Sequence, residues 1–286
     1  MSILTSIINA ILQAIGWILP ISEAGHSAVF HDFSGRADGS VWQLTGVIHI
    51  GIAVGIVLAS FSIFKRMSLE FVAAGKELFR KELDVKSGTA ARRYLYMLMI
   101  AFLPMLLWLI PLGKLGFLYS FLRGFSFNGT LLDEGLLLIV TGVLLVLASR
   151  QLTLGRNDRD VSLAYALIIG FASVLLVPVA GLSLTGGVIS VLLILGVTKK
   201  YSLNFALLMS VPVLIVMGII EIVTAEFTVS VVEIIIGAVL SVAAAFVCTR
   251  VLKYILKNNL LKFFGYYDGA IGIIIAVTGI IQLIVR

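Results

Sequence analysis

The sequence has few charged residues, which narrows the class of protein, and a single cysteine, which is uninformative. Only 13% of the 286 residues are charged, 60% are apolar, and the mean hydropathy is +1.13. Soluble domains carry about 25% charged residues, so a soluble core could not absorb this much apolar surface. The lone Cys248 lies in an apolar stretch, where packing is its expected role, and we assign it no chemistry.

The N-terminus lacks the features of a cleavable signal peptide. Its first ten residues, MSILTSIINA, contain no Lys or Arg, and no small-residue cleavage site follows before Glu23. Since a secretory signal has both a basic start and such a site, we expect the N-terminus to be retained.

Apolar runs of membrane-spanning length recur along the chain. A spanning helix needs about 20 mostly apolar residues. Runs of this kind are found at 41–64, 94–111, 131–149, 203–221, 228–248 and 266–285. We therefore predict six transmembrane helices.

Two further apolar regions are interrupted in the middle. Residues 3–30 are broken by Pro20 and the polar residues after it, and residues 161–197 by Pro178 and a glycine-rich stretch. Non-helical backbone at membrane depth survives only where protein or a wet cavity covers it, so such breaks are typical of re-entrant hairpins. The sequence thus predicts an all-α integral membrane protein: one polytopic domain with six transmembrane helices and two re-entrant helical hairpins.

Basic residues predict the orientation of these helices. Seventeen of the 21 Lys and Arg residues lie in 65–93, 150–160, 199–200 and 249–265. Short loops rich in Lys and Arg face the cytoplasm, and the first of these segments, with its mixed charges, should be a solvated loop or helix. The other four, Arg36, Lys114, Arg123 and Arg286, then lie outside. Orientation and anionic lipid explain the net charge of +6, so nucleic acid is not an expected partner.

On this topology the two hairpins insert from opposite sides of the membrane. The first, within 1–40, enters from the outer side, and the second, within 161–198, enters from the cytoplasmic side. Oppositely inserted hairpins, each followed by full spans, are typical of an inverted repeat whose tips meet near the bilayer midplane. We expect the functional site where the tips meet.

The first hairpin holds the leading candidate residues. Ser22, Glu23 and His26 lie within one polar turn in apolar surroundings, followed by His31 and Asp32. Ionisable groups at membrane depth indicate function; Glu23 and His26 could act as acid and base, and Ser22 as a nucleophile activated by His26. The alternative is a shallow hairpin at the outer interface, where these residues meet water and cap helix ends.

Further candidates lie in two later segments. His49, alone among apolar neighbours, could face the hairpin or could bond to backbone or a lipid headgroup. The stretch Gly181-Leu-Ser-Leu-Thr-Gly-Gly187 could bare backbone N–H groups toward an anion, with hydroxyls from Ser183 and Thr185, as a phosphate cradle. Small residues also let transmembrane helices pack closely, and that alternative stays open.

Three segments resemble a known family. Leu19-Pro-Ile-Ser-Glu-Ala-Gly-His26, followed by Val47-Ile-His-Ile-Gly51, is similar to the EGxxEFLPVSSTGH region of the undecaprenyl-diphosphate phosphatase family, also called bacitracin-resistance proteins. The segment from Gly196 to Pro212 is similar to that family's GVSRYxAxxFSFLLxxP motif. The resemblance covers most of the chain. It implies a multi-pass enzyme of the bacterial inner membrane that removes a phosphate from the diphosphate lipid carrier of peptidoglycan synthesis, using two re-entrant hairpins and six spans.

The first family motif is kept in part. Ser22, Gly25 and His26 match the end of the motif. The replaced positions are Gln13 and Trp17, where the family has two glutamates, and Glu23, where it has a second serine. In the resemblance, these positions belong to the catalytic site, so its chemistry must differ here.

The second family motif lacks its arginine in this chain. The PGxSRSG sequence of the family aligns with Ala180-Gly-Leu-Ser-Leu-Thr-Gly186, so the arginine expected to neutralise phosphate falls on Leu184. Phosphoryl transfer depends on charge stabilisation around the phosphate oxygens. The usual mechanism of the family cannot run unchanged without this arginine and the two glutamates.

Three hypotheses are consistent with these residues. The first is a phosphatase with a remodelled site, in which Glu23, His26 and His49 supply acid–base groups or bind a divalent cation such as Mg²⁺ or Ca²⁺. The second is a non-catalytic binder, translocator or regulator of polyprenyl phosphate or diphosphate lipids, with proton coupling through Glu23 and His26. The third is a scaffold for an amphiphile with a cationic or neutral headgroup. The expected substrate-binding residues are Gln13, Gly25, His49, Gly181, Ser183, Thr185 and Gly186. Homodimer formation is left open.

Overall fold

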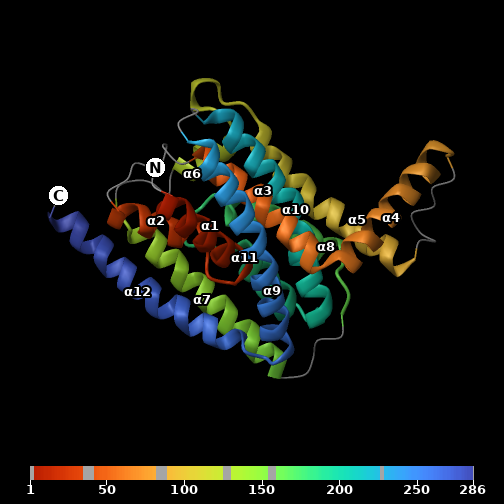
Figure 1. Ribbon diagram of the computed structural model, residues 1–286. Coiled ribbons are helices and arrows are strands. Elements are labelled where there is room, and N and C mark those ends of the chain that lie inside the picture. Colours follow the sequence, from red (N-terminus) through yellow and green to blue (C-terminus); the bar gives the residue numbers. More distant parts are fainter. Residues whose placement is uncertain are drawn as a thin grey trace.

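A computed structural model describes residues 3–34, 42–81, 89–124, 130–153, 159–225 and 229–285. Within these ranges the chain forms helices and connecting turns, with two isolated β-bridges and no strand. Figure 1 shows the helices packed into one bundle, from which α4 projects. The all-α fold class is therefore confirmed. Lys86, Arg156 and the predicted outer residues Arg36 and Arg286 lie outside the described residues.

The helices follow one another in this order: α1 (Ile3–Ile18), α2 (Glu23–Ser34), α3 (Trp42–Ala59), α4 (Phe61–Phe79), α5 (Ala90–Phe102), the 3-10 helices η2 (Leu103–Leu109) and η3 (Gly113–Leu115), α6 (Leu118–Gly124), α7 (Leu132–Thr153), α8 (Leu163–Leu176), α9 (Leu184–Ile194), α10 (Lys199–Thr224), α11 (Val231–Lys257) and α12 (Leu261–Val285).

Five helical segments are long and apolar enough to cross a membrane: Ala90–Leu109, Leu132–Leu152, Lys199–Thr224, Val231–Lys257 and Leu261–Val285. Helix α3 becomes a sixth candidate if it is joined with α4, but the chain turns by 96° between the two. The span predicted at 41–64 therefore stops at Ala59. The reason is chemical, because α4 carries Lys65, Arg66 and Glu70, which hydrocarbon would not solvate.

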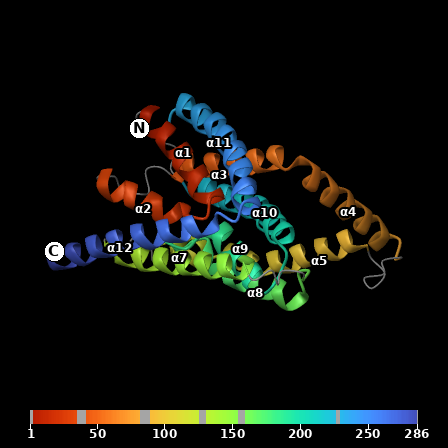
Figure 2. The ribbon, with the colours of Figure 1, turned by 90° about the horizontal axis from the view of Figure 1, so that it is seen from below.

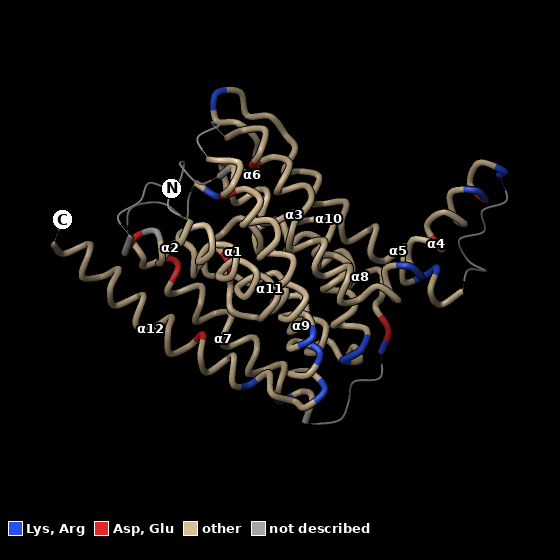
Figure 3. The backbone as a smooth tube through the Cα atoms, viewed as in Figure 1, with Lys and Arg blue, Asp and Glu red and all other residues tan. Residues whose placement is uncertain are grey.

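The basic ends of several helices meet at one end of the bundle. Lys199, at the start of α10, donates a hydrogen bond to Asn259 between α11 and α12 over 2.7 Å. Lys253, near the end of α11, donates to the backbone oxygen of Ala59, the last residue of α3, over 2.8 Å. Figure 3 shows Lys and Arg gathered at this end and on α4. The clustering agrees with the charge pattern expected of a cytoplasmic face.

The opposite end is tied together by Gln282 of α12. Its amide donates to Asp32 of α2 over 2.8 Å, and its amide oxygen accepts from the backbone N–H of Leu131, just before α7, over 2.9 Å. Helices α7 and α12 lie side by side in both Figure 1 and Figure 2. A Cβ on Gly142 of α7 would come within 2.9 Å of the Gly269 nitrogen of α12, so small residues permit this close approach.

Two helix pairs are broken where the sequence predicts hairpins, and their breaks touch. The first break separates α1 from α2 at residues 19–22, and the second separates α8 from α9 at residues 177–183. Thr185 donates its hydroxyl to the backbone oxygen of Trp17 over 2.7 Å. A Cβ on Gly25 would come within 3.0 Å of the Gly181 nitrogen, and one on Gly186 within 2.9 Å of Pro20. We call this contact region the junction.

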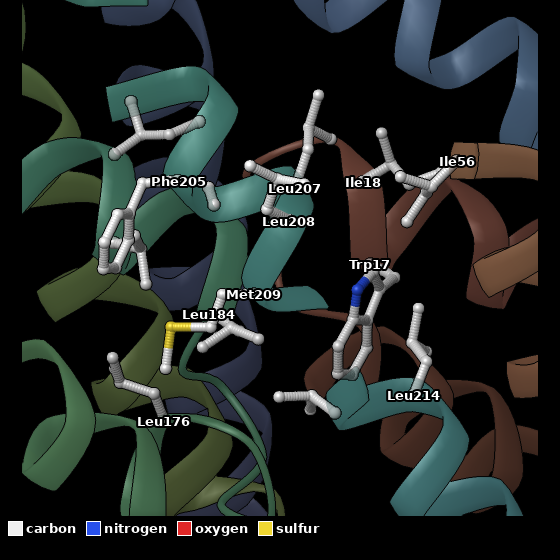
Figure 4. Close-up of a cluster of buried hydrophobic side chains, with 14 of the residues drawn as sticks. Trp17, Ile18, Ile56, Leu176, Leu184, Phe205, Leu207, Leu208, Met209 and Leu214 are labelled. Carbon is white, nitrogen blue, oxygen red and sulfur yellow. The ribbon is translucent and has the colours of Figure 1, made fainter. Parts of the chain in front are cut away.

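Apolar side chains seal the junction on one side. Trp17 of α1 and Leu184 of α9 are 5% and 4% exposed, and both belong to one buried cluster with Met209 and Leu214 of α10. Figure 4 shows these side chains together. On this side, the polar residues of the junction are therefore covered by buried apolar side chains.

Candidate functional site

Glu23 opens helix α2 and lies inside the protein. Ser22, just before it, has a positive φ of 59°, and its hydroxyl accepts a hydrogen bond from the Gly25 backbone N–H over 3.2 Å. This bond caps the helix, and an acidic first residue suits the positive end of the helix dipole. The Glu23 side chain accepts from the Ser27 hydroxyl over 2.9 Å, and the residue is 6% exposed. The carboxylate is thus held in place from its own helix.

His49 of α3 faces Glu23 from the other side of the junction. Its Nε2 lies 4.0 Å from a carboxylate oxygen of Glu23, and the residue is fully buried. That separation is too long for a hydrogen bond but short enough for one bridging group to contact both atoms. The structure therefore brings together two residues that are 26 positions apart in the sequence.

Three buried polar atoms around this pair lack hydrogen-bond partners among the described residues: Gln13 Oε1, Trp17 Nε1 and His49 Nε2. Gln13 donates with its other amide atom to Thr45 over 3.4 Å, and the Trp17 and His49 rings lie 5.8 Å apart. A cavity of about 10 Å³ is bordered by Trp17 and Glu23. This volume is about that of one water-sized probe, so a larger group enters only if the helices of the junction separate.

Behind His49, a second carboxylate holds the ring. Nδ1 of His49 lies 2.6 Å from Glu221 of α10. Tyr119 of α6 donates its hydroxyl to the other oxygen of Glu221 over 2.9 Å, and Arg123 of α6 donates to that same oxygen and to the Tyr119 hydroxyl. All four residues are buried. Buried charges persist where they are paired, and in this network the charge of Arg123 compensates that of Glu221.

His26 points to a different neighbour. Its Nδ1 lies 2.9 Å from the Ser22 backbone oxygen, its Nε2 lies 3.0 Å from the hydroxyl of Tyr267 of α12, and the two rings are stacked. Both ring nitrogens therefore have partners, and neither is the Ser22 hydroxyl. The predicted roles of Ser22 as nucleophile and His26 as its base stay predictions, without a hydrogen bond between the two side chains in the described structure.

The candidate phosphate cradle is a tightly bonded turn. Gly181 has a φ of +92°, and its oxygen accepts from Thr141 of α7 over 3.0 Å. Ser183 caps α9, its hydroxyl accepting from the Gly186 N–H over 3.1 Å. The next N–H, of Gly187, bonds to the Ser183 backbone oxygen over 2.7 Å. Two of the N–H groups expected to face an anion are thus already occupied, and the cradle stays a prediction.

The carboxylate that holds His49 is not among the residues predicted for the site. Glu221 ends the span predicted at 203–221, and Arg123 is predicted only as an outer charge. A signal was present, because Glu221 stands in the apolar run Met217-Gly-Ile-Ile-Glu-Ile-Val, and an ionisable residue within a span indicates a buried partner. Nothing in the local sequence indicates that this partner is His49.

The described residues contain no group of three or more His, Cys, Asp or Glu side chains placed to hold a metal ion. At the junction, Glu23 supplies one carboxylate and Gln13 one amide oxygen, and the Trp17 indole N–H cannot bind a metal ion. Mg²⁺ and Ca²⁺ need several oxygen ligands. The residues present therefore do not fit a resident metal centre.

Comparison with known proteins agrees with the fold over nearly the whole chain. Residues 6–274 match the family model of the bacitracin resistance protein BacA. An undecaprenyl-diphosphatase of Methanosphaera stadtmanae is 28% identical over 294 residues, covering 98% of this chain and 99% of that protein. Another, of Alkaliphilus metalliredigens, is 28% identical over 287 residues, covering 96% and 98%. The chain therefore belongs to the bacitracin resistance protein BacA family and is a multi-pass membrane protein.

Proposed function

We propose that this protein binds a polyprenyl diphosphate lipid and hydrolyses it to the monophosphate at a remodelled site in the junction. The observation that carries the proposal is the placement of buried Glu23 and His49, 4.0 Å apart, beside polar atoms that lack partners in the described part of the chain. The similarity to full-length undecaprenyl-diphosphatases supports the same substrate class. In this arrangement the two broken helix pairs are re-entrant hairpins, and the remaining long helices cross the bilayer.

His49 is the general base in this proposal. A water molecule between His49 and Glu23 loses a proton to His49 Nε2, and its oxygen attacks the terminal phosphorus of the diphosphate. The bond between that phosphorus and the bridging oxygen breaks, and the products are inorganic phosphate and the lipid monophosphate. The Trp17 indole N–H, which has no partner among the described residues, is available to donate a hydrogen bond to a phosphate oxygen. Direct attack by water needs no hydrogen bond between Ser22 and His26.

A second function is favoured by one observation about charge. The buried basic residues in the described ranges are Arg92 and Arg123, and both pair with glutamates. Neither is free to neutralise phosphate, although phosphoryl transfer depends on such stabilisation. The second proposal is therefore a protein that binds the lipid phosphate and moves it across the membrane without hydrolysis, with Glu23 and His49 exchanging a proton.

Phosphate release from undecaprenyl diphosphate by purified protein in liposomes, with and without Mg²⁺ or Ca²⁺, tests the first proposal. Release that falls about 100-fold or more in Glu23→Gln and His49→Gln, and survives in Ser22→Ala and His26→Ala, supports water attack at the junction. Glu233→Gln is the matched control. Glu233 is also buried, but it caps α11 through Ser230, a role that glutamine also fills.

The two proposed functions give different results in the same liposomes. Hydrolysis is overturned if the wild-type protein releases no phosphate under any of these conditions while it still binds the lipid. In that case, transfer of a fluorescent polyprenyl phosphate between leaflets, lost in Glu23→Gln and retained in Glu233→Gln, supports translocation. Absence of both activities overturns both proposals.

A further inference from the structure

Helices α6 and α10 supply three residues that do not face the junction but hold a residue that does. Glu221 contacts His49 with one carboxylate oxygen and contacts Tyr119 and Arg123 with the other. Glu221 and Tyr119 are fully buried, and Arg123 is 6% exposed. Such a chain of buried hydrogen bonds fixes the orientation of every member, because an alternative rotamer would leave a buried polar group without a partner.

The charges in this chain decide which nitrogen of His49 carries a hydrogen. The ion pair with Arg123 keeps Glu221 as a carboxylate, which only accepts hydrogen bonds. The 2.6 Å contact with Nδ1 therefore requires a hydrogen on Nδ1. In neutral imidazole the other nitrogen then has a free lone pair. That nitrogen, Nε2, is the one that lies 4.0 Å from Glu23 and has no hydrogen-bond partner in the described structure.

We propose that Glu221 is a positioning residue, clamped by Arg123 and Tyr119, which fixes His49 as the Nδ1–H tautomer and aims Nε2 at the junction. The chemical consequence rests on the proposed hydrolysis, in which Nε2 takes a proton from the attacking water. The resulting imidazolium is stabilised by the adjacent Glu221 carboxylate, as in catalytic triads, where a carboxylate holds the histidine without accepting its proton. The short helix α6 thereby becomes part of the functional site.

Nitrogen NMR of the three histidines tests the tautomer directly, without reference to activity. The protein is labelled with ¹⁵N-histidine in detergent micelles, and the His49 signals are assigned by their loss in His49→Gln. We expect wild-type His49 to be the Nδ1–H tautomer. Glu221→Gln removes the obligatory acceptor, because an amide can also donate to Nδ1, so the tautomer should become mixed or reversed. Glu233→Gln should leave the His49 signals unchanged.

Kinetics test the consequence for hydrolysis. Glu221→Gln should lower kcat about 100-fold or more with KM changed by less than about threefold, because the lost interaction acts in the transition state. The double variant His49→Gln/Glu221→Gln should be no slower than His49→Gln alone, since Glu221 acts through His49. Tyr119→Phe removes one bond to Glu221 and keeps the aromatic ring, so a smaller loss of kcat is expected.

The outcomes separate this inference from the proposed function. A wild-type His49 with its hydrogen on Nε2, or an unchanged tautomer and kcat in Glu221→Gln, overturns the positioning role even if hydrolysis is shown. An Nδ1–H tautomer that depends on Glu221 in a protein that releases no phosphate leaves the positioning role standing and refutes hydrolysis. If Glu221→Gln does not fold, the double variant Arg123→Met/Glu221→Gln removes both members of the buried ion pair and gives the same NMR test.

Discussion

Removing the cation from the Arg123–Glu221 pair should destabilise the protein strongly. Arg123→Met leaves the fully buried Glu221 carboxylate with only His49 and Tyr119 as partners. Breaking a buried ion pair by deleting one member costs about 3–5 kcal/mol, because the remaining charge is uncompensated. Every 1.4 kcal/mol is a factor of ten, so the unfolding equilibrium should move by about 10²- to 10⁴-fold. The double variant Arg123→Met/Glu221→Gln removes both charges and should recover about 2–3 kcal/mol of this loss.

Denaturant titration in detergent, with tryptophan fluorescence as the readout, measures the free energy of unfolding of the wild type and of these variants. Lys114→Met is the matched control. Lys114 is also a predicted outer cation but is exposed, so its removal should change the free energy of unfolding by less than about 0.5 kcal/mol. The reasoning is refuted if Arg123→Met unfolds within about 1 kcal/mol of the wild type. It is also refuted if the double variant is no more stable than the single one, since the cost would then not come from the unpaired carboxylate.

Three further changes test the junction and the basic end of the bundle. Thr185→Val removes the hydroxyl that bonds the Trp17 backbone oxygen, and denaturant titration should show a loss of about 1–3 kcal/mol. Gly181→Ala puts a Cβ at a φ of +92° and within 2.5 Å of a backbone oxygen of α7, so the same titration should show a larger loss, of about 2–4 kcal/mol. The hydrogen bond from Arg92 lowers the pKa of Glu77, so this contact between α4 and α5 persists above the ordinary value of 4.5 and weakens as the pH falls below it. A spin-label distance between α4 and α5 should lengthen in acid, and Glu77→Gln should reduce that pH dependence, because Glu70 is then the carboxylate of α4 that still pairs with Arg92.

The broken helix pairs could be predicted because their signals are local. Pro20 and Pro178 interrupt apolar runs that are otherwise long enough for helices, and both interruptions are breaks in the structure. The bend after Ala59 was missed because the apolar run continues past Ser60 for four residues, so composition alone placed the helix end too late. The charged residues of the projecting helix begin at Lys65, four residues after its start at Phe61, so the turn comes before the change in charge.

The partners in the candidate site could not be predicted from local patterns. His49 and Glu221 are 172 positions apart, and Arg123 and Glu221 are 98 apart. Each looks isolated in its own apolar segment, and only the packing of α3, α6 and α10 brings them together. Conversely, Ser22, Glu23 and His26 are adjacent in sequence, yet Glu23 faces α3 while His26 faces α12. Proximity along the chain did not determine which side chains interact.

The positions that differ from the family motif are related to one another in space. Trp17 and Leu184, which stand where the family motifs lead us to expect a glutamate and the arginine, border the same small cavity and belong to the same buried apolar cluster (Figure 4). Replacing only one of two facing charges would leave the other buried without a partner, which costs several kcal/mol, whereas replacing both gives an apolar contact. The ionisable groups that remain, Glu23, His49 and Glu221, lie on α2, α3 and α10 instead. In the proposed function, the groups that bind a proton at the junction therefore lie on these helices rather than at Trp17 and Leu184, so the chemistry depends on moving a proton at the lipid headgroup.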